Sequence, residues 1–370
     1  MRVLLAGGGT GGHIYPALAV AEGLKAVYPD LEFLYVGTKK GLENTIVPQS
    51  GLPFTTITVE GLPRKFSPAL LKAGFKAVEG GVEALGIVRR FRPDLVIGTG
   101  GYVCGPVIMA AKVCHVPAVI HEQNAFPGVT NKALARIADL VLVNFEDAKK
   151  YFAHPEKVLK TGLPIRPEVL ETNKQAGLAF LGLSPEKKTL LVSGGSRGAK
   201  SINKAMAAAY PKLLKHKKLQ VIHLTGTLDY NETLQAMLKQ HIRPEDYPQL
   251  VIRPYLHEME YALAAADFCV GRAGATYLAE ITACGLPAIL IPYPFASENH
   301  QQYNAQSLVD CGAAKMILDQ ALSGETLYSA LEPLIEENDY RILMAEKAAQ
   351  AGNRDALNKI IELLKPYLNQ

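Results

Sequence analysis

The chain has 370 residues, 48% of them hydrophobic and 20% charged, which is the composition of a globular protein long enough for about two domains. No apolar run approaches the roughly 18 residues of a membrane-spanning helix, and Met1–Ala6 runs into glycines, which predicts a strand rather than a signal peptide. Five cysteines without a C-x-x-C pair indicate reduced thiols in a cytoplasm. The net charge of +4 is unevenly distributed, because residues 1–164 carry 18 Lys and Arg against 13 Asp and Glu. The excess of positive charge in this half indicates either an anionic partner or an ordinary solvated surface.

Apolar runs alternate with helical stretches along the whole chain, the pattern of an α/β protein with parallel sheets and helices on both faces. The segment 162–167 holds one glycine and two prolines, which predicts a stiff connection between two domains. The expected strands are Val3–Ala6, Phe33–Val36, Phe54–Val59, Leu95–Ile97, Ala118–His121 and Leu140–Val143 in the first half, and Leu190–Ser193, Gln220–Leu224, Leu250–Arg253, Phe268–Val270 and Ala288–Ile291 in the second.

The last segment of the chain is expected to be helical. Its apolar residues Leu357, Ile360, Ile361 and Leu364 recur at helical spacing. We therefore expect a first domain over 1–163, a second over 164–340, and a helix within 341–370 that crosses back to complete the first domain.

The first glycine-rich loop, Gly7–Gly12, follows a predicted strand and matches G-x-G-x-x-G. The next strand ends in Thr38-Lys39-Lys40 and lacks the acidic residue that holds a ribose in NAD enzymes; NAD is disfavoured, and NADP with the lysines on its 2′-phosphate stays open. His13 follows the loop at a helix start, where a neutral imidazole is favoured. It is either a general base or a group that caps or packs the helix.

Two more glycine-rich loops open helices in the second half, at Gly194–Gly198 and Gly271–Gly274, and N–H groups at helix starts favour phosphate. The segment 198–201 has one residue too many for a Walker A loop, which argues against an ATPase. In the first half, His121–Asn124 ends a predicted strand, at the edge where such sheets bind ligands, and we expect its polar side chains to lie outside the core.

Metal-binding motifs are missing from the sequence. It contains no D-x-D pair and no His/Cys cluster with metal spacing. A bound diphosphate would therefore be neutralised by helix ends, backbone N–H groups and Arg side chains, with no metal or cofactor.

Six motifs in this order resemble the MurG family, the peripheral membrane glycosyltransferases of peptidoglycan synthesis, over nearly the whole chain. The resemblance implies an α/β GT-B fold, with two Rossmann-like, doubly wound parallel-sheet domains facing a cleft. It also implies an inverting hexosyltransferase that moves N-acetylglucosamine from UDP-N-acetylglucosamine to the muramoyl 4-hydroxyl of lipid I (undecaprenyl-pyrophosphoryl-muramoyl-pentapeptide), giving lipid II and UDP. The motifs are Gly9–His13 with Pro16-Ala17, His121–Asn124, Gly162-x-Pro164-x-Arg166, Gly194-Gly195-Ser196, Arg272–Glu280 and Gln301–Ala305.

By position in these motifs, the resemblance implies that His13 is the catalytic base or a charge-stabilising group. Glu280 would hold the ribose, and the backbone at Leu256 the uracil. Arg197 and Tyr277 depart from the family pattern, which commonly has glutamine and a small hydroxyl residue there. The other implied contacts are with the diphosphate (Ser196, Arg272, Gly274, Ala275, Thr276), with the amino sugar (Asn124, Gln301, Gln302) and elsewhere in the donor site (Thr10, Gly11, Gly12, Arg166).

A lipid-linked acceptor implies a peripheral protein on the cytoplasmic face of the cell membrane. Within 64–92, Leu71, Phe75, Val78, Val82 and Leu85 keep helical spacing, and we expect them to face the sheet. Phe66 and Leu70 would then contact an anionic membrane together with the basic residues Arg64, Lys65, Lys72, Lys76, Arg89, Arg90 and Arg92. Proteins of cell-wall synthesis are further partners under this reading, and nucleic acid is not.

Three other functions stay open. The chain could be a different GT-B enzyme, either a UDP-sugar epimerase or a glycosyltransferase with a soluble acceptor. It could be an NADP oxidoreductase, although the glycine loops of its second half argue against that. It could also be a catalytically silent nucleotide-sugar binding protein, which the presence of His13, Glu280 and Gln301 disfavours.

Overall fold

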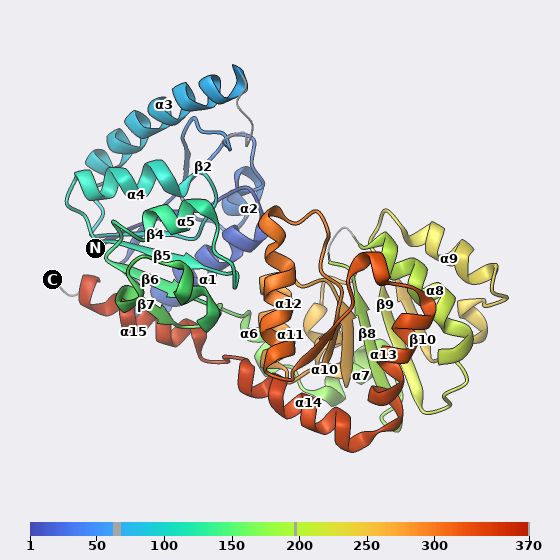
Figure 1. The fold of residues 1–370 in the computed structure, drawn as a ribbon. Helices are drawn as coiled ribbons and strands as arrows, with labels where there is room; N and C mark the ends of the chain where they lie inside the picture. The colour runs from blue at the N-terminus through green and yellow to red at the C-terminus, as the bar shows by residue number, and fades with distance from the viewer. Residues whose placement is uncertain (62–67, 196–197, 369–370) are drawn as a thin grey trace. The chain divides into compact units, whose positions relative to one another are not determined.

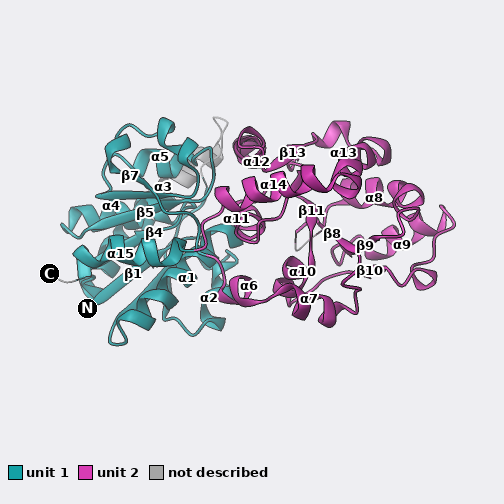
Figure 2. Ribbon diagram, turned by 90° about the horizontal axis from the view of Figure 1, so that it is seen from below, with its two compact units in different colours: residues 1–164, 355–370 teal, residues 165–354 magenta. Residues whose placement is uncertain are grey.

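The computed structural model describes residues 1–61, 68–195 and 198–368, with the helix alone given for 68–75. The chain divides into two compact units, coloured separately in Figure 2. Unit 1 comprises 1–164 and 355–370, and unit 2 comprises 165–354. Each unit is built on one parallel sheet with helices packed against it (Figure 1).

The sheet of unit 1 has seven strands in the order β3-β2-β1-β4-β5-β6-β7. The order reverses at β1, which pairs with β2 on one side and β4 on the other, so a topological switch point lies between the carboxyl ends of β1 and β4. The strands are β1 Arg2–Ala6, β2 Glu32–Gly37, β3 Phe54–Thr56, β4 Leu95–Gly98, β5 Ala118–Glu122, β6 Leu140–Val143 and β7 Val158–Lys160. The helices are α1 Gly11–Val27, α2 Glu43–Gln49, α3 Pro68–Phe91, α4 Cys104–Val113, α5 Val129–Leu134 and α15 Ala356–Leu368, with short 3₁₀ turns η1 Glu146–Tyr151 and η2 Pro155–Lys157.

The sheet of unit 2 has six strands in the order β10-β9-β8-β11-β12-β13, and its switch point lies between β8 and β11. The strands are β8 Lys188–Ser193, β9 Leu219–Leu224, β10 Leu250–Arg253, β11 Phe268–Gly271, β12 Ala288–Leu290 and β13 Ala314–Met316. The helices are α6 Pro167–Glu171, α7 Lys174–Leu181, α8 Lys200–Leu213, α9 Tyr230–Leu238, α10 Met259–Ala265, α11 Ala275–Ala283, α12 His300–Asp310, α13 Gly324–Glu336 and α14 Asn338–Ala351, with 3₁₀ turns η3 Pro244–Asp246, η4 Ser297–Asn299 and η5 Asp319–Ala321.

The predicted fold class, two doubly wound parallel sheets, is confirmed. The sequence analysis missed one strand at an edge of each sheet, β7 and β13. Each has three residues, and Leu159, Lys160, Lys315 and Met316 are at least partly exposed, so neither strand forms a buried apolar run. The predicted strand 54–59 is also shorter, ending at Thr56.

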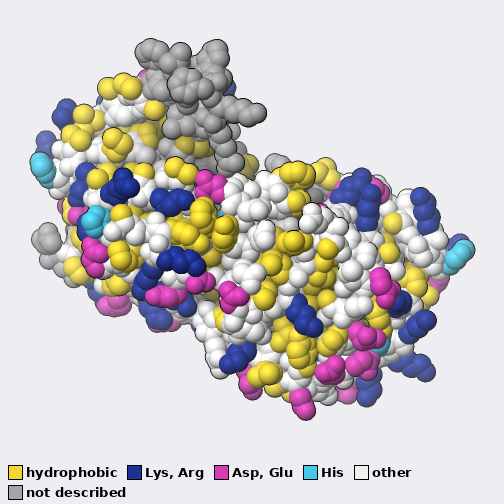
Figure 3. Space-filling view, viewed as in Figure 1, with side chains coloured by type: hydrophobic (Ala, Val, Ile, Leu, Met, Phe, Trp, Pro, Cys, Tyr) yellow, Lys and Arg dark blue, Asp and Glu magenta, His cyan; other side chains and the backbone are white. Residues whose placement is uncertain are grey.

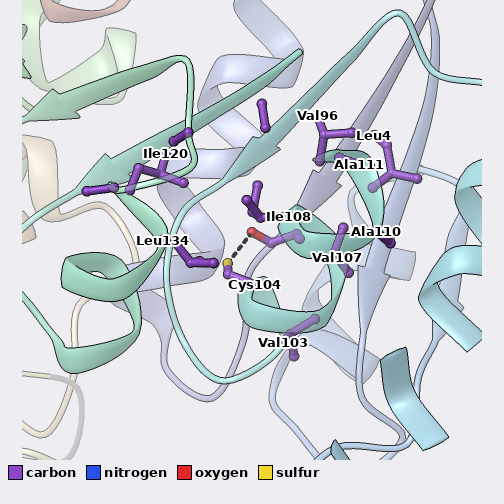
Figure 4. Close-up of a cluster of buried hydrophobic side chains, with 14 of the residues drawn as sticks. Leu4, Val96, Val103, Cys104, Val107, Ile108, Ala110, Ala111, Ile120 and Leu134 are labelled. Atoms are coloured by element: carbon purple, nitrogen blue, oxygen red, sulfur yellow. Dashed lines mark hydrogen bonds between the residues drawn. The ribbon is translucent and has the colours of Figure 1, made fainter. Parts of the chain in front are cut away.

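Alternate residues of β1 pack on opposite faces of the sheet, as the period of a strand requires. Leu4 and Ala6 belong to a core cluster that includes residues of α4, and Figure 4 shows Leu4, Val96 and Ile120 near Val107 and Ile108. Val3 and Leu5 belong to the cluster on the other face, which includes residues of α1 and α15. Both faces of the central strand are therefore buried.

The segment expected to cross back, 341–370, is divided between the units. Residues through Arg354 belong to unit 2, where α14 packs against α11. Only α15 belongs to unit 1, and it packs against α1 so closely that a Cβ on Gly23 would lie 2.8 Å from Leu357 Cδ1. The apolar stripe that suggested the crossing lies entirely on α15, which explains why the rest of the segment follows a different course.

The expected orientation of α3 is wrong for two residues. Val78 and Val82 are each 68% exposed, whereas Ala84 and Val88 are buried against the sheet. The buried stripe continues back to Gly80, where a Cβ would lie 2.5 Å from the Thr58 carbonyl oxygen. Because the backbones approach closely at Gly80, the side of α3 that carries Gly80, Ala84 and Val88 faces the sheet. The spacing of apolar residues does not predict this, because glycine has no apolar side chain. Phe66 and the side chains of Leu70 and Lys72 lie outside the described residues.

None of the helices that the structure describes is both long enough and apolar enough to cross a membrane.

Candidate functional site

In unit 1 the glycine loop lies at the switch point, between the end of β1 and the start of α1. Two of its glycines leave no space for a side chain: a Cβ would lie 2.3 Å from Thr99 Oγ1 at Gly7, and 2.6 Å from Glu43 Oε1 at Gly8. Thr10 is the N-cap of α1, and the N–H groups of the next two glycines precede the first intrahelical hydrogen bonds, which run to the Thr10 carbonyl. Such a helix start can bind an anion.

His13 is held at this loop by its ring. Its Nδ1 lies 3.0 Å from the Gly8 carbonyl oxygen. Because a carbonyl can only accept a hydrogen bond, this contact favours the tautomer with the proton on Nδ1 and the lone pair on Nε2. The Thr10 hydroxyl, 3.4 Å from Nδ1, can accept from the same N–H. The ring packs against Gly100, where a Cβ would lie 3.0 Å from Nε2, and the Thr99 hydroxyl donates to the His13 carbonyl at 2.6 Å. The geometry therefore presents Nε2 as a proton acceptor.

The expectation that His121–Asn124 lies outside the core is wrong for three of its four residues. His121, Glu122 and Gln123 are each 2% exposed, and only Asn124 is half-buried. The His121 ring donates from Nε2 to the Gly162 carbonyl at 2.9 Å, and burial lowers its pKa to about 4, so it stays neutral.

The buried carboxylate of this segment organises the following turn. Glu122 accepts hydrogen bonds from the backbone N–H and the amide of Asn124, from the Asn131 amide and from the Gly128 N–H, at 2.8–3.1 Å. These donors stabilise the carboxylate in place of water. The segment thus supports the loop around Asn124 from inside.

In unit 2 the second glycine loop also lies at the switch point, after β8. At Gly194 a Cβ would lie 2.3 Å from the Ala199 nitrogen, and Gly195 and Gly198 have φ of +88° and +80°, a region that favours glycine. Ser196 and Arg197, between them, lie outside the described residues.

The other side of this switch point is the start of α11. Gly274 is its N-cap without a side-chain cap, and the N–H groups of Ala275 and Thr276 precede the first intrahelical bond, from Leu278 N–H to the Gly274 carbonyl. Tyr277, one of the two departures, turns its ring back onto Gly271, where a Cβ would lie 2.5 Å from Tyr277 Cε1. Burial raises the pKa of Tyr277 above its ordinary value.

Arg272 precedes this helix, and its guanidinium is bound within the protein. Nη1 pairs with Asp319 Oδ1 at 2.6 Å and also donates to the carbonyls of Ile291 and Pro292, at 3.2 Å each. Nη2 donates to the Ser201 hydroxyl at 2.9 Å. The side chain that we expected to face a diphosphate thus joins the segment after β12, η5 and α8 around the loop.

Arg166 and Glu280, predicted from separate motifs, lie together. Arg166 Nη2 is 3.5 Å from Glu280 Oε1, and Arg166 Nη1 is 3.7 Å from Glu260 Oε2. Burial raises the pKa of Glu280, the neighbouring Arg166 opposes that rise, and the charge of Glu260 adds to it. One half-exposed arginine therefore faces two carboxylates.

The predicted glutamines start α12. Gln301 Oε1 accepts from the N–H groups of Ala273, at 3.2 Å, and Tyr293, at 2.9 Å, which directs its amide nitrogen away from these loops. Gln302 Oε1 accepts from the Asn299 amide at 3.3 Å. Asn299 and Glu298 both have φ above +50°, an uncommon conformation for residues other than glycine. Leu256 follows β10, with its side chain buried.

Two carboxylates beside the candidate site residues were not found from the sequence: Glu43, against the first glycine loop, and Glu260, beside Arg166. Glu43 had a signal, since it follows the second predicted strand within a few residues, the region where NAD enzymes carry an acidic residue. Glu260 had none, because it comes to Arg166 from α10, far along the chain. No group of three or more His, Cys, Asp and Glu side chains that could hold a metal occurs among the residues that the structure describes.

Comparison with known proteins agrees with this arrangement. Residues 3–143 match the glycosyltransferase family 28 N-terminal domain, and residues 189–360 match the glycosyltransferase family 28 C-terminal domain. The chain belongs to glycosyltransferase family 28. The two matched ranges include both switch points and all three glycine-rich loops.

Relatives within family 28 match over the full length. A protein of Desulforamulus reducens is 48% identical over 368 residues, covering 100% of this chain and 99% of the relative. One of Desulfitobacterium hafniense is 48% identical over 363 residues, covering 98% of each. Both are named UDP-N-acetylglucosamine--N-acetylmuramyl-(pentapeptide) pyrophosphoryl-undecaprenol N-acetylglucosamine transferase.

The crystal structure of MurG from Acinetobacter baumannii superposes with a TM-score of 0.79 at 28% identity, covering 99% of each chain. The resemblance to the MurG family is confirmed, and the fold is that of the GT-B glycosyltransferases, with two Rossmann-like domains.

Proposed function

We propose that this protein transfers N-acetylglucosamine from UDP-N-acetylglucosamine to the muramoyl 4-hydroxyl of lipid I, giving lipid II and UDP in peptidoglycan synthesis. One observation carries the proposal: a relative named for this transfer is 48% identical over 368 residues, and the match covers 100% of this chain. The identity therefore extends over both sheets and both glycine loops.

We assign the donor to unit 2. The described glycines of the second loop, Gly195 and Gly198 among them, and the start of α11 support a diphosphate there, since their N–H groups and the helix dipole offer positive charge without a metal. Arg272 supports the loop by its contacts with Asp319 and Ser201 rather than by binding the ligand itself. Ser196 remains a proposed contact on its motif alone.

The nucleoside would be held by Glu280 and Leu256. The Glu280 carboxylate, 9% exposed and steadied by Arg166, would accept from the ribose hydroxyls. The backbone N–H and carbonyl of Leu256 make no backbone hydrogen bond within the described part of the chain, which supports a role in binding uracil. Gln301 would donate to the sugar through its amide nitrogen, because its amide oxygen already accepts from the N–H groups of Ala273 and Tyr293. Gln302 and Asn124 remain proposed sugar contacts on their motifs alone.

The chemistry would be a single inverting displacement. The muramoyl 4-hydroxyl attacks the anomeric carbon in line, the bond to the diphosphate oxygen breaks, and its electron pair leaves with UDP. The hydroxyl proton passes to Nε2 of His13, the ring nitrogen with the free lone pair. The N–H groups of unit 2 stabilise the charge that grows on the diphosphate.

We further propose that unit 1 binds the cytoplasmic membrane surface, where the lipid-linked acceptor lies. Val78 and Val82 on α3, and Met109 and Val113 on the neighbouring α4, are each at least 58% exposed. Figure 3 shows hydrophobic and basic side chains near one another over these helices. Co-sedimentation with anionic vesicles tests this: Val78→Ser/Val82→Ser should weaken binding, and Ile342→Ser/Leu343→Ser, at exposed apolar positions of unit 2, should not.

The function itself is tested by radiolabel transfer from UDP-N-acetylglucosamine to a short-chain lipid I analogue, with UDP-glucose and UDP-N-acetylgalactosamine as competing donors. Transfer confined to the N-acetylglucosamine donor is expected. Tight UDP binding without transfer would contradict the proposed acceptor. Release of free sugar from the donor alone would point to an epimerase.

A further inference from the structure

The proposed reaction does not use Glu43, although its carboxyl side chain is buried. Glu43, the first residue of α2, is 0% exposed. Three glycines make room for it: a Cβ at Gly8, Gly37 or Gly41 would lie 2.6 Å or less from an atom of the Glu43 side chain. Burying a carboxylate is costly unless donors replace its water. The absence of a side chain at these three glycines therefore lets the carboxylate lie against the glycine loop.

The donors that face Glu43 show what it holds. Oε1 accepts from the backbone N–H of Thr38 at 3.1 Å and from its hydroxyl at 2.7 Å. Oε2 accepts from the Gly9 N–H at 3.0 Å. All three groups are donors, so this geometry uses both carboxylate oxygens as acceptors, and one of them binds the catalytic loop directly.

The Gly9 N–H and the Gly8 carbonyl belong to the same peptide group. Its N–H donates to Glu43, and its carbonyl accepts from Nδ1 of His13 at 3.0 Å. Because the peptide group is planar and trans, fixing the direction of the N–H also fixes the direction of the carbonyl. Neither residue has a Cβ to resist rotation of this peptide, so the carboxylate is the group that keeps the carbonyl turned toward His13.

We propose that Glu43 is a positioning residue that sets the tautomer and orientation of His13 through the Gly8–Gly9 peptide. The carboxylate polarises the peptide, which makes its carbonyl a stronger acceptor for the Nδ1 proton. Nε2 is then left to take the proton of the attacking hydroxyl, while Nδ1 keeps its own proton and Glu43 keeps accepting from the Gly9 N–H. The catalytic meaning of this arrangement rests on the proposed function; the tautomer does not.

The rest of the loop is held independently of Glu43. The Tyr35 hydroxyl donates to the Gly7 carbonyl at 3.1 Å, and the Thr99 hydroxyl donates to the His13 carbonyl at 2.6 Å. Replacing the carboxylate by an amide should therefore disturb one peptide group rather than unfold the loop. Glu43→Gln keeps the size of the side chain but has one acceptor oxygen for donors on two sides, so it must present an NH₂ to one of them.

The test is nitrogen NMR of the full chain with ¹⁵N-labelled histidine, without substrates, at a pH where His13 is neutral; His13→Gln assigns the signal. Native protein should show His13 protonated at Nδ1. Glu43→Gln should shift the population toward the Nε2-protonated form. In the transfer assay it should lower kcat about 10-fold or more, within the roughly 10²–10⁴-fold that general-base catalysis contributes, and change the donor KM less than about threefold.

Two further variants separate positioning from stability. Gly41→Ala forces the carboxylate to move without changing its charge, because the new Cβ would overlap both of its oxygens, and it should shift the tautomer in the same direction. Val47→Ala removes buried methyl groups from the same helix without touching the carboxylate and should leave tautomer and kcat unchanged. An unchanged tautomer in both Glu43→Gln and Gly41→Ala, or an equal shift in Val47→Ala, would overturn the proposal. A native tautomer signal in a protein that transfers no sugar would instead count against the proposed function.

Discussion

Arg272→Ala decides whether this arginine supports the donor site or binds the donor. The guanidinium and its partner Asp319 are mostly buried, with side chains 13% and 19% exposed, and the pair is 2.6 Å apart. Removing one member of a buried ion pair costs roughly 3–5 kcal/mol because the other charge is left without a partner. A loss of about 1 kcal/mol in the free energy of unfolding lowers the melting temperature of a domain this size by roughly 2–4 °C. Unit 2 of the variant should therefore melt roughly 10 °C lower than native unit 2.

The assay is a double-mutant cycle, with thermal unfolding and UDP binding by calorimetry measured for each variant. Arg272→Ala/Asp319→Ala should recover part of the loss, because the unpaired carboxylate is gone, and the two single changes should therefore be clearly non-additive. UDP should still bind the folded single variant, though less tightly. A variant with the native melting temperature and a large loss of UDP affinity would refute the reasoning and make the guanidinium a ligand of the diphosphate.

The other predictions concern chemistry, packing and pH. His13→Ala should mainly lower kcat and Glu280→Ala should mainly raise the donor KM; equal effects on both constants in steady-state kinetics would contradict this division. Gly100→Ala should lower kcat, because its Cβ would lie 2.8 Å from His13 Cδ2 and its φ is +111°, whereas Gly105→Ala, with open space around its Cβ, should match native kinetics. Leu364→Ala, at a fully buried position of α15, should lower the free energy of unfolding by about 2–5 kcal/mol in denaturant titrations; a loss below the uncertainty of that titration would show that α15 adds little to unit 1. Burial raises the pKa of Glu280, so the folded state binds the proton more tightly than the unfolded state, and the free energy of unfolding should fall as pH rises from the ordinary carboxyl pKa through the raised one. Glu280→Gln should remove that slope, and an identical pH dependence in both proteins would exclude Glu280 as its source.

The sequence was sufficient for the features that local pattern controls. Apolar runs of three to six residues predicted the buried central strands, and glycines after three of them predicted loops at helix starts. A buried parallel strand and a crowded turn each restrict which residues can occupy them. The order of motifs also indicated the family. Partly exposed edge strands such as β7 lack that restriction and were missed.

Only the tertiary structure showed which polar side chains bind other parts of the protein. The string His121–Gln123 reads like a binding site but is buried, and Arg272 reads like a phosphate ligand but is paired with Asp319. Glu43, which no motif singled out, accepts a hydrogen bond from the Gly9 N–H. A charged side chain is stabilised by the donors or acceptors that surround it. Gly9, a partner of Glu43, and Asp319, a partner of Arg272, each lie tens of residues away along the chain. Spacing along the chain does not contain that information; the packing of helices on the sheet supplies it.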